Sequence, residues 1–168
     1  MKLDSLESGR EVFIDANIFI SHFTGLSNES SNFLTLCEDG DLTGITSINV
    51  VLEVLHRLMI IEAIRKNLAS PPNVVKKLGC SPEKIKQLEE YFINSRKIPE
   101  MGIAIKPISS DIIFKSQIFR RKYGLMVNDS IVIAIMQEEG IKALATNDEV
   151  FLKIPEISVY KPNDVNYV

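Results

Sequence analysis

Cysteine and histidine are scarce in this chain, which has two of each among its 168 residues. Neither Cys37 nor Cys80 has a Cys or His partner at the spacing of a zinc site, so a zinc centre is not expected. The chain has no recognisable Ser-His-Asp or Cys-His arrangement and no glycine-rich loop for phosphate. We therefore interpret the cysteines as reduced packing residues, and His22 and His56 as packing or surface residues.

Long hydrophobic runs are also absent. The longest uninterrupted apolar run, residues 131–136, is far shorter than the roughly 20 residues of a membrane-spanning helix. Residues 1–8 mix charged and polar side chains where a signal peptide needs a continuous apolar stretch. We expect a soluble, cytoplasmic protein without a membrane partner.

The composition itself is that of an ordinary globular protein. Hydrophobic residues make up 45% of the chain and charged residues 24%, which excludes disordered and fibrous classes. A chain of this length can bury a sizeable core in one unit. We therefore expect residues 1–168 to form a single domain.

Charge is distributed unevenly along the chain, although the net charge is only -3. Residues 65–122 contain 13 of the 19 basic residues and five acidic ones, so this stretch carries +8 and the remainder -11. Charged residues on solvated helix faces are common, and each one alone needs no further explanation. The asymmetry as a whole favours a polyanion that is held by its phosphates beside an acidic pocket.

Short apolar runs alternate with helical patterns along the chain. Strands are predicted at residues 11–14, 42–45, 103–108, 143–146 and 157–160. Helices are predicted from about residue 18, then over residues 28–37, 48–66, 81–97, 109–124 and 128–140, with a connection at residues 67–79. This alternation predicts a three-layer α/β/α sandwich around a mainly parallel sheet.

Polar residues mark the starts of several predicted helices. Ser47 precedes the long helix, Ser81 stands before a proline at the first helical position, and Ser109 or Ser110 precedes the next helix. Asn128 is the expected N-cap of the helix that ends at Gly140.

Four acidic residues are expected at one edge of the sheet. Asp15 follows the first strand directly, and Asp148 comes two residues after the strand ending at Thr146. Asp129 lies in the first turn of its helix, and Glu53 in the second turn of the long helix. Because ligand sites of such folds lie beyond the carboxyl ends of the strands, the four acids are expected to meet there.

Each acid also has a simpler interpretation. Asp15 and Asp148 could be loop or capping residues, and Asp129 could only complement its helix dipole. Glu53 differs because its neighbours in sequence are apolar, where a carboxylate is costly to desolvate without a partner. Four carboxylates close together repel one another unless cations are present, and oxygen ligands select Mg²⁺ or Mn²⁺.

The sequence resembles the PIN-domain ribonuclease family through four motifs. An apolar strand ends in an acid that is followed at one remove by Asn17, and a capped helix carries Glu53. Two further segments place Asp129 and Asp148 in the family's order over nearly the whole chain. The four segments are residues 13–20 (FIDANIFI), 47–54 (SINVVLEV), 128–134 (NDSIVIA) and 145–151 (ATNDEVF).

The resemblance implies metal-dependent hydrolysis of RNA phosphodiester bonds. Asp15 would be the central ligand, Asp129 and Asp148 would complete the metal shell, and Glu53 would ligate the ion or accept a proton from water. Asn17 and Thr146 are expected to orient the carboxylates, although Asn17 could equally be a helix cap.

Two features depart from the usual pattern of the family. Val150 stands where many relatives have a second aspartate. Residues 65–100 are longer than in the smallest relatives, and we interpret them as a helical elaboration.

Within the family, the length of the chain favours a VapC-like toxin of a toxin–antitoxin pair. Such toxins are usually homodimers restrained by a small antitoxin protein. Alternatives are a housekeeping RNA-processing nuclease, a catalytically silent module that binds RNA or protein, and an aspartyl phosphatase, which would need a second Asp at Asn17. Arg120, Arg121 and Lys122 are the RNA-binding candidates, although the same residues could only complement the end of their helix.

Overall fold

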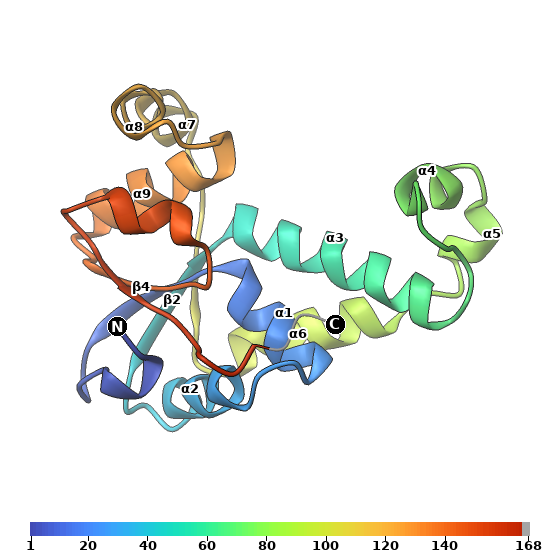
Figure 1. The fold of residues 1–168 in the computed structure, drawn as a ribbon, viewed down its shortest axis with the longest axis horizontal. Helices are drawn as coiled ribbons and strands as arrows, with labels where there is room; N and C mark the ends of the chain where they lie inside the picture. The colour runs from blue at the N-terminus through green and yellow to red at the C-terminus, as the bar shows by residue number, and fades with distance from the viewer. Residues whose placement is uncertain (166–168) are drawn as a thin grey trace.

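The centre of the fold is a five-stranded sheet in a computed structural model that describes residues 1–165 (Figure 1). All four strand pairings are parallel, and the strand order is β3-β2-β1-β4-β5. The strands are β1 (Glu11–Ile14), β2 (Thr43–Ser47), β3 (Ala104–Lys106), β4 (Ala143–Ala145) and β5 (Ser158–Tyr160). The predicted mainly parallel sheet is therefore confirmed, and each strand lies close to its predicted position.

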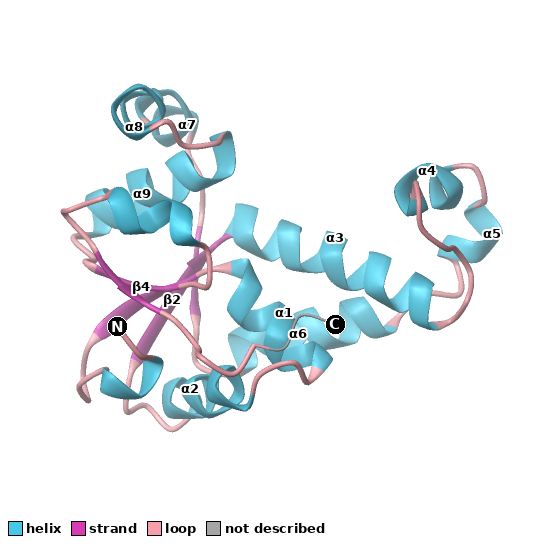
Figure 2. Cartoon of the chain, in the orientation of Figure 1, coloured by secondary structure: helices cyan, strands magenta, loops and turns pink. Residues whose placement is uncertain are grey.

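Helices cover both faces of the sheet, which confirms the three-layer architecture (Figure 2). One side carries α1 (Ala16–Thr24), α2 (Asn28–Glu38), α3 (Ile48–Arg65) and α6 (Glu90–Glu100), and the other carries α7 (Ser110–Lys115), α8 (Gln117–Tyr123) and α9 (Val127–Glu139). Short 3-10 helices η1 (Leu3–Ser5) and η2 (Glu149–Lys153) stand near the ends. Because both faces are covered, Val12, Phe13 and Ile14 of β1 are fully buried.

Helices α3 and α6 pack against each other and extend away from the sheet (Figure 1). Their far end carries α4 (Val74–Gly79) and α5 (Pro82–Ile85). A small apolar cluster holds this end together, separate from the main core. Its buried members are Ala63, Ala69, Val74, Leu78 and Leu88.

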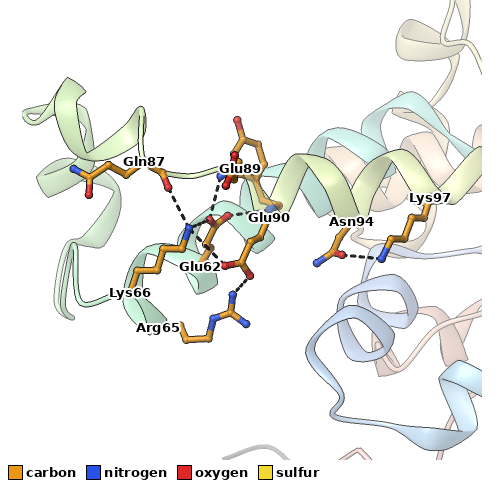
Figure 3. A network of polar contacts seen from close by, with 9 residues as sticks. Glu62, Arg65, Lys66, Gln87, Glu89, Glu90, Asn94 and Lys97 are labelled. Atoms are coloured by element: carbon orange, nitrogen blue, oxygen red, sulfur yellow. Dashed lines mark hydrogen bonds and ion pairs between the residues drawn. The ribbon is translucent and has the colours of Figure 1, made fainter.

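Glu62 on α3 is the polar centre of this arm (Figure 3). Its side chain is 3% exposed and accepts hydrogen bonds from the backbone N–H groups of Glu89 (3.0 Å) and Tyr91 (2.9 Å). It also forms an ion pair with Lys66 at 2.7 Å. Burial raises the pKa of Glu62, but these partners outweigh burial and the net pKa is lowered.

The Glu62 contacts explain why one predicted helix was wrong. The sequence predicts a continuous helix over residues 81–97, whereas the structure has α5 and α6 with a break between them. Glu89 has a non-helical backbone (φ -142°, ψ -26°). The N–H groups of Glu89 and Tyr91, which a continuous helix would satisfy internally, donate to the Glu62 carboxylate instead. The predicted connection at residues 67–79 also contains α4.

Two predictions on the other side of the sheet also need correction. The helix predicted over residues 109–124 is divided at Ser116, whose hydroxyl donates to the carbonyl of Ile113 at 2.7 Å and competes with the helical bonds. Helix α9 begins at Val127, with Met126 rather than Asn128 at the N-cap. The N–H of Ser130 already closes the first turn on the carbonyl of Met126, so Asn128 lies inside the helix.

Other local predictions are confirmed in part. Ser47 is the N-cap residue of α3, but its hydroxyl donates to the side chain of Asn49 and makes no cap bond. Ser109 caps α7 by accepting from the N–H of Ile112 at 3.2 Å. Cys37 is a buried packing residue as predicted, whereas Cys80, the C-cap residue of α4, is exposed and the prediction was wrong for it. Among residues 1–165, no helix is long and apolar enough to cross a membrane.

Candidate active site at the carboxyl edge of the sheet

Asp15 lies where β1 ends and α1 begins. It is the N-cap residue of α1, and its Oδ1 accepts from the N–H of Ala16 at 2.7 Å. Its Oδ2 accepts from the amide of Asn17 at 2.7 Å and from the hydroxyl of Thr146 at 2.6 Å. Three donors therefore fix the orientation of this carboxylate.

Thr146 joins the ends of the two central strands. It follows β4 directly and is fully buried, and its Oγ1 accepts from the N–H of Asp148 (3.0 Å) and from Asn17 (2.9 Å). The side-chain oxygen of Asn17 accepts from the N–H of Asn147 at 2.9 Å. Asn17 and Thr146 thus both donate to the Asp15 carboxylate and bond each other.

The pKa of Asp15 is raised from 3.8 to about 6. Burial is the largest cause, and the negative charges of Glu53 and Asp129 add to it, against the hydrogen bonds from Thr146 and Ala16. The pKa of Asp129 is also raised, by burial first and then by the charge of Asp148. Asp15 therefore lies within electrostatic range of Glu53 and Asp129, and Asp129 within range of Asp148.

The other three acids have different degrees of exposure. Glu53 and Asp129 are partly buried, whereas Asp148 is exposed and caps η2 by accepting from the N–H of Val150 at 2.9 Å. The apolar neighbours of Glu53 suggested a costly burial, but Leu52 beside it is 60% exposed. The surroundings of Glu53 are therefore wetter than its sequence suggests, because this face of α3 is not covered.

The four acids have no basic side chain in ion-pair contact within the described residues. In the same residues, no three His, Cys, Asp or Glu side chains have the geometry to hold a metal ion together. Carboxylate oxygens are the donors that a hard cation prefers, so the chemistry of the four acids fits Mg²⁺ or Mn²⁺.

The three basic candidates at the end of α8 have different surroundings. Arg120 is partly buried and donates to Ser116 and Ser130. Arg121 is exposed. Lys122 is exposed and forms an ion pair with Glu156 at 2.7 Å. The run of cations in the sequence is therefore not one continuous patch.

Sequence reasoning missed Lys153 at the end of η2. Its charge lowers the pKa of Asp129, against the larger effect of burial. The position of Lys153, shortly after Asp148 in the sequence, could have indicated this contact. The sequence pattern did not predict the helix η2 that carries Lys153. His56 is exposed. His22 hydrogen bonds to Ser31 at 2.9 Å, and burial is the main cause of its lowered pKa.

Solved structures with a similar fold come from toxin–antitoxin systems. A toxin–antitoxin complex from Klebsiella pneumoniae matches with a TM-score of 0.55 and 22% identity over 88% of this chain and 95% of that chain. The VapBC2 complex from Rickettsia felis, bound to a DNA fragment from its promoter, matches with a TM-score of 0.58 and 16% identity over 91% and 99%.

A third structure is VapC20 of Mycobacterium tuberculosis, described as a toxin that cleaves the sarcin-ricin loop. It matches with a TM-score of 0.56 and 12% identity over 84% of this chain and 93% of that chain. At these identities the three structures show the fold alone. No curated protein sequence matches the chain.

The family model named PIN domain matches residues 12–157. This match spans β1 to the residue before β5 and includes all four acids at the sheet edge. The chain therefore belongs to the PIN domain family.

Proposed function

We propose that this protein is a ribonuclease that hydrolyses RNA phosphodiester bonds with Mg²⁺ or Mn²⁺. The observation that carries the proposal is the arrangement at Asp15. Its carboxylate is fixed by Ala16, Asn17 and Thr146. It lies beside other carboxylates with a raised pKa, and within residues 1–165 it forms no ion pair. Strongly perturbed acids in such a position are typical of functional sites. Family membership supports the same assignment.

Asp15, Asp129 and Asp148 are proposed to hold the metal, with Glu53 either ligating it or accepting a proton from water. The bound cation would acidify a water and neutralise charge on the phosphate. Thr146 and Asn17 hold the Oδ2 of Asp15 in place, which leaves little freedom for this carboxylate to rotate. Arg121 is the basic candidate whose exposure leaves it free to meet RNA phosphates.

We further propose that the protein is the toxin of a toxin–antitoxin pair, acting in the cytoplasm as a homodimer and restrained by a small antitoxin. The similar folds of the Klebsiella and Rickettsia complexes support this role. All of residues 1–168 would form the nuclease domain, with residues 65–100 as an elaboration of it.

The test is cleavage of RNA by the purified protein. Cleavage should require Mg²⁺ or Mn²⁺, stop with EDTA and return when Mn²⁺ is added in excess. Asp15→Asn should abolish it, whereas the exposed control Asp41→Asn should not. Undiminished cleavage after thorough chelation would contradict the metal mechanism.

A further inference from the structure

Arg120 makes contacts unlike those of the neighbouring cations. Its Nη1 donates to the hydroxyl of Ser116 at 2.9 Å and to that of Ser130 at 2.8 Å, and its Nε donates to the side chain of Gln117 at 2.7 Å. All three acceptors are neutral, and within residues 1–165 no carboxylate forms an ion pair with Arg120. The guanidinium is thus held by oriented hydroxyl groups on two helices.

The two serines are arranged to receive this guanidinium. Both are fully buried. The hydroxyl of Ser130 donates to the carbonyl of Val127 at 2.7 Å, and that of Ser116 donates to the carbonyl of Ile113 at 2.7 Å. Each hydroxyl has therefore used its one proton and offers only lone pairs to Arg120. Hydrogen bonds from a charged donor to such acceptors are stronger than neutral ones.

Ser130 follows Asp129 in the first turn of α9. That turn has no side-chain cap, because the N-cap residue is Met126. Helix ends without caps fray easily. In this turn the Ser130 hydroxyl links the backbone of Val127 to Arg120 on α8, which packs against α9 (Figure 1). The bond to Ser116 extends the link to the end of α7.

We infer that Arg120 is a positioning residue that clamps the first turn of α9 and so sets the place of Asp129, rather than a residue that binds RNA phosphate. The inference rests on the proposed function, since Asp129 is there a metal ligand. It replaces the expectation that Arg120, Arg121 and Lys122 bind RNA together. Of the two exposed cations of this run, Lys122 is paired with Glu156, whereas Arg121 forms no ion pair within residues 1–165.

The experiment compares Arg120→Met with Arg121→Met, a matched loss of charge one residue away. Mn²⁺ affinity is measured by calorimetry and RNA binding across a salt series. Hydrogen exchange is measured at the amides of residues 130–133, whose bonds close the first turns of α9. Arg120→Met should speed exchange in this turn and weaken Mn²⁺ binding by about 10-fold, as loss of a group that supports a ligand does. It should leave the salt slope of RNA binding unchanged.

Arg121→Met should do the reverse, leaving Mn²⁺ affinity intact and lowering the log–log salt slope by about 0.7. Ser130→Ala should weaken Mn²⁺ binding as Arg120→Met does, and the double variant should be no weaker than either. Arg120→Lys keeps a cationic donor and should recover most of the Mn²⁺ affinity. If Arg120→Met does not fold, Arg120→Lys is measured in its place.

An Arg120→Met protein with unchanged exchange in residues 130–133 and a lowered salt slope would overturn the inference. Absence of Mn²⁺ binding by the wild-type protein would instead be a failure of the proposed function. Hydrogen exchange in the first turn of α9 separates these two outcomes, because it measures the stability of that turn in the absence of metal.

Discussion

Asp15 and Glu62 are two carboxylates that the fold withdraws from water, one at the sheet edge and the other in the helical arm. Burial raises the pKa of both. At Glu62 the ion pair with Lys66 and two backbone N–H groups reverse the shift. At Asp15 the hydrogen bonds from Thr146 and Ala16 do not, and neighbouring carboxylates add to the rise.

The difference distinguishes an acid that stabilises the fold from one that the fold only tolerates. Glu62 has its partners within the chain and connects α3 to the start of α6 through the N–H of Glu89 (Figure 3). Hydrogen bonds from its neighbours orient Asp15, but no positive charge compensates it. This is typical of a functional residue whose partner is a bound ligand. Three perturbations test this comparison.

The largest effect is expected from Glu62→Ala. Removing the carboxylate leaves the N–H groups of Glu89 and Tyr91 without their acceptor. It also removes the shorter of the two ion pairs of Lys66, which keeps its pair with Glu90 at 3.5 Å. We expect a loss of about 3 kcal/mol in the free energy of unfolding, measured with urea. The control is Glu83→Ala, which breaks the exposed pair with Lys86 and should cost less than about 1 kcal/mol.

If Glu62→Ala costs no more than Glu83→Ala, the Glu62 contacts do not hold the arm. The pH response gives a second check. Because the pKa of Glu62 is lowered, its contribution is present above the ordinary value of 4.5 and is lost as the pH falls through the folded pKa. The acid-induced loss of stability should therefore be smaller in Glu62→Ala.

A smaller effect is expected when Mn²⁺ is added to the wild-type protein. A ligand that binds only the folded state at 100 times its Kd stabilises by about 2.7 kcal/mol. The Tm should rise accordingly, and Asp15→Asn should lose most of this rise. The control Asp41→Asn should keep it, and an equal rise in Asp15→Asn would place the ion elsewhere.

The smallest effect is expected for Asp15→Asn without metal. A folded pKa of about 6 means that ionised Asp15 destabilises the fold, progressively from pH 4 to 6 and fully above. The variant removes this charge but satisfies the donors Ala16, Asn17 and Thr146 less well, so we expect a net gain of about 1 kcal/mol at pH 8. At pH 3.5 the gain should vanish. Urea unfolding at both values measures it, and a clear loss at pH 8 would make Asp15 structural.

The gathering of the acids at one edge was predictable because parallel strands all end at the same side. Asp15 follows β1 and Asp148 follows β4, and the structure pairs these two strands directly. The order of strands was not needed for this inference. Thr146 was predictable for the same reason, since it directly follows β4 and therefore faces Asp15.

The helical arm was less predictable because tertiary contacts decide it. In the sequence, Glu62 and Lys66 look like an ordinary surface pair one helical turn apart. Only the packing of α6 on α3 buries Glu62 and makes it the acceptor for Glu89 and Tyr91. Likewise, the sequence shows Arg120 only as part of a basic run. Its hydrogen bonds to Ser116 and Ser130 depend on the packing of α8 on α9.

The contact between Asp15 and Thr146 joins residues 131 positions apart in the sequence. A ribosome makes the chain from its N-terminus, so β1 and Asp15 emerge long before β4 and Thr146. Until β4 inserts beside β1, no Thr146 hydroxyl restrains the Asp15 carboxylate and no Asp148 lies near Asp129. A nascent chain that is still attached to its own messenger RNA therefore lacks the complete acid cluster for most of its synthesis.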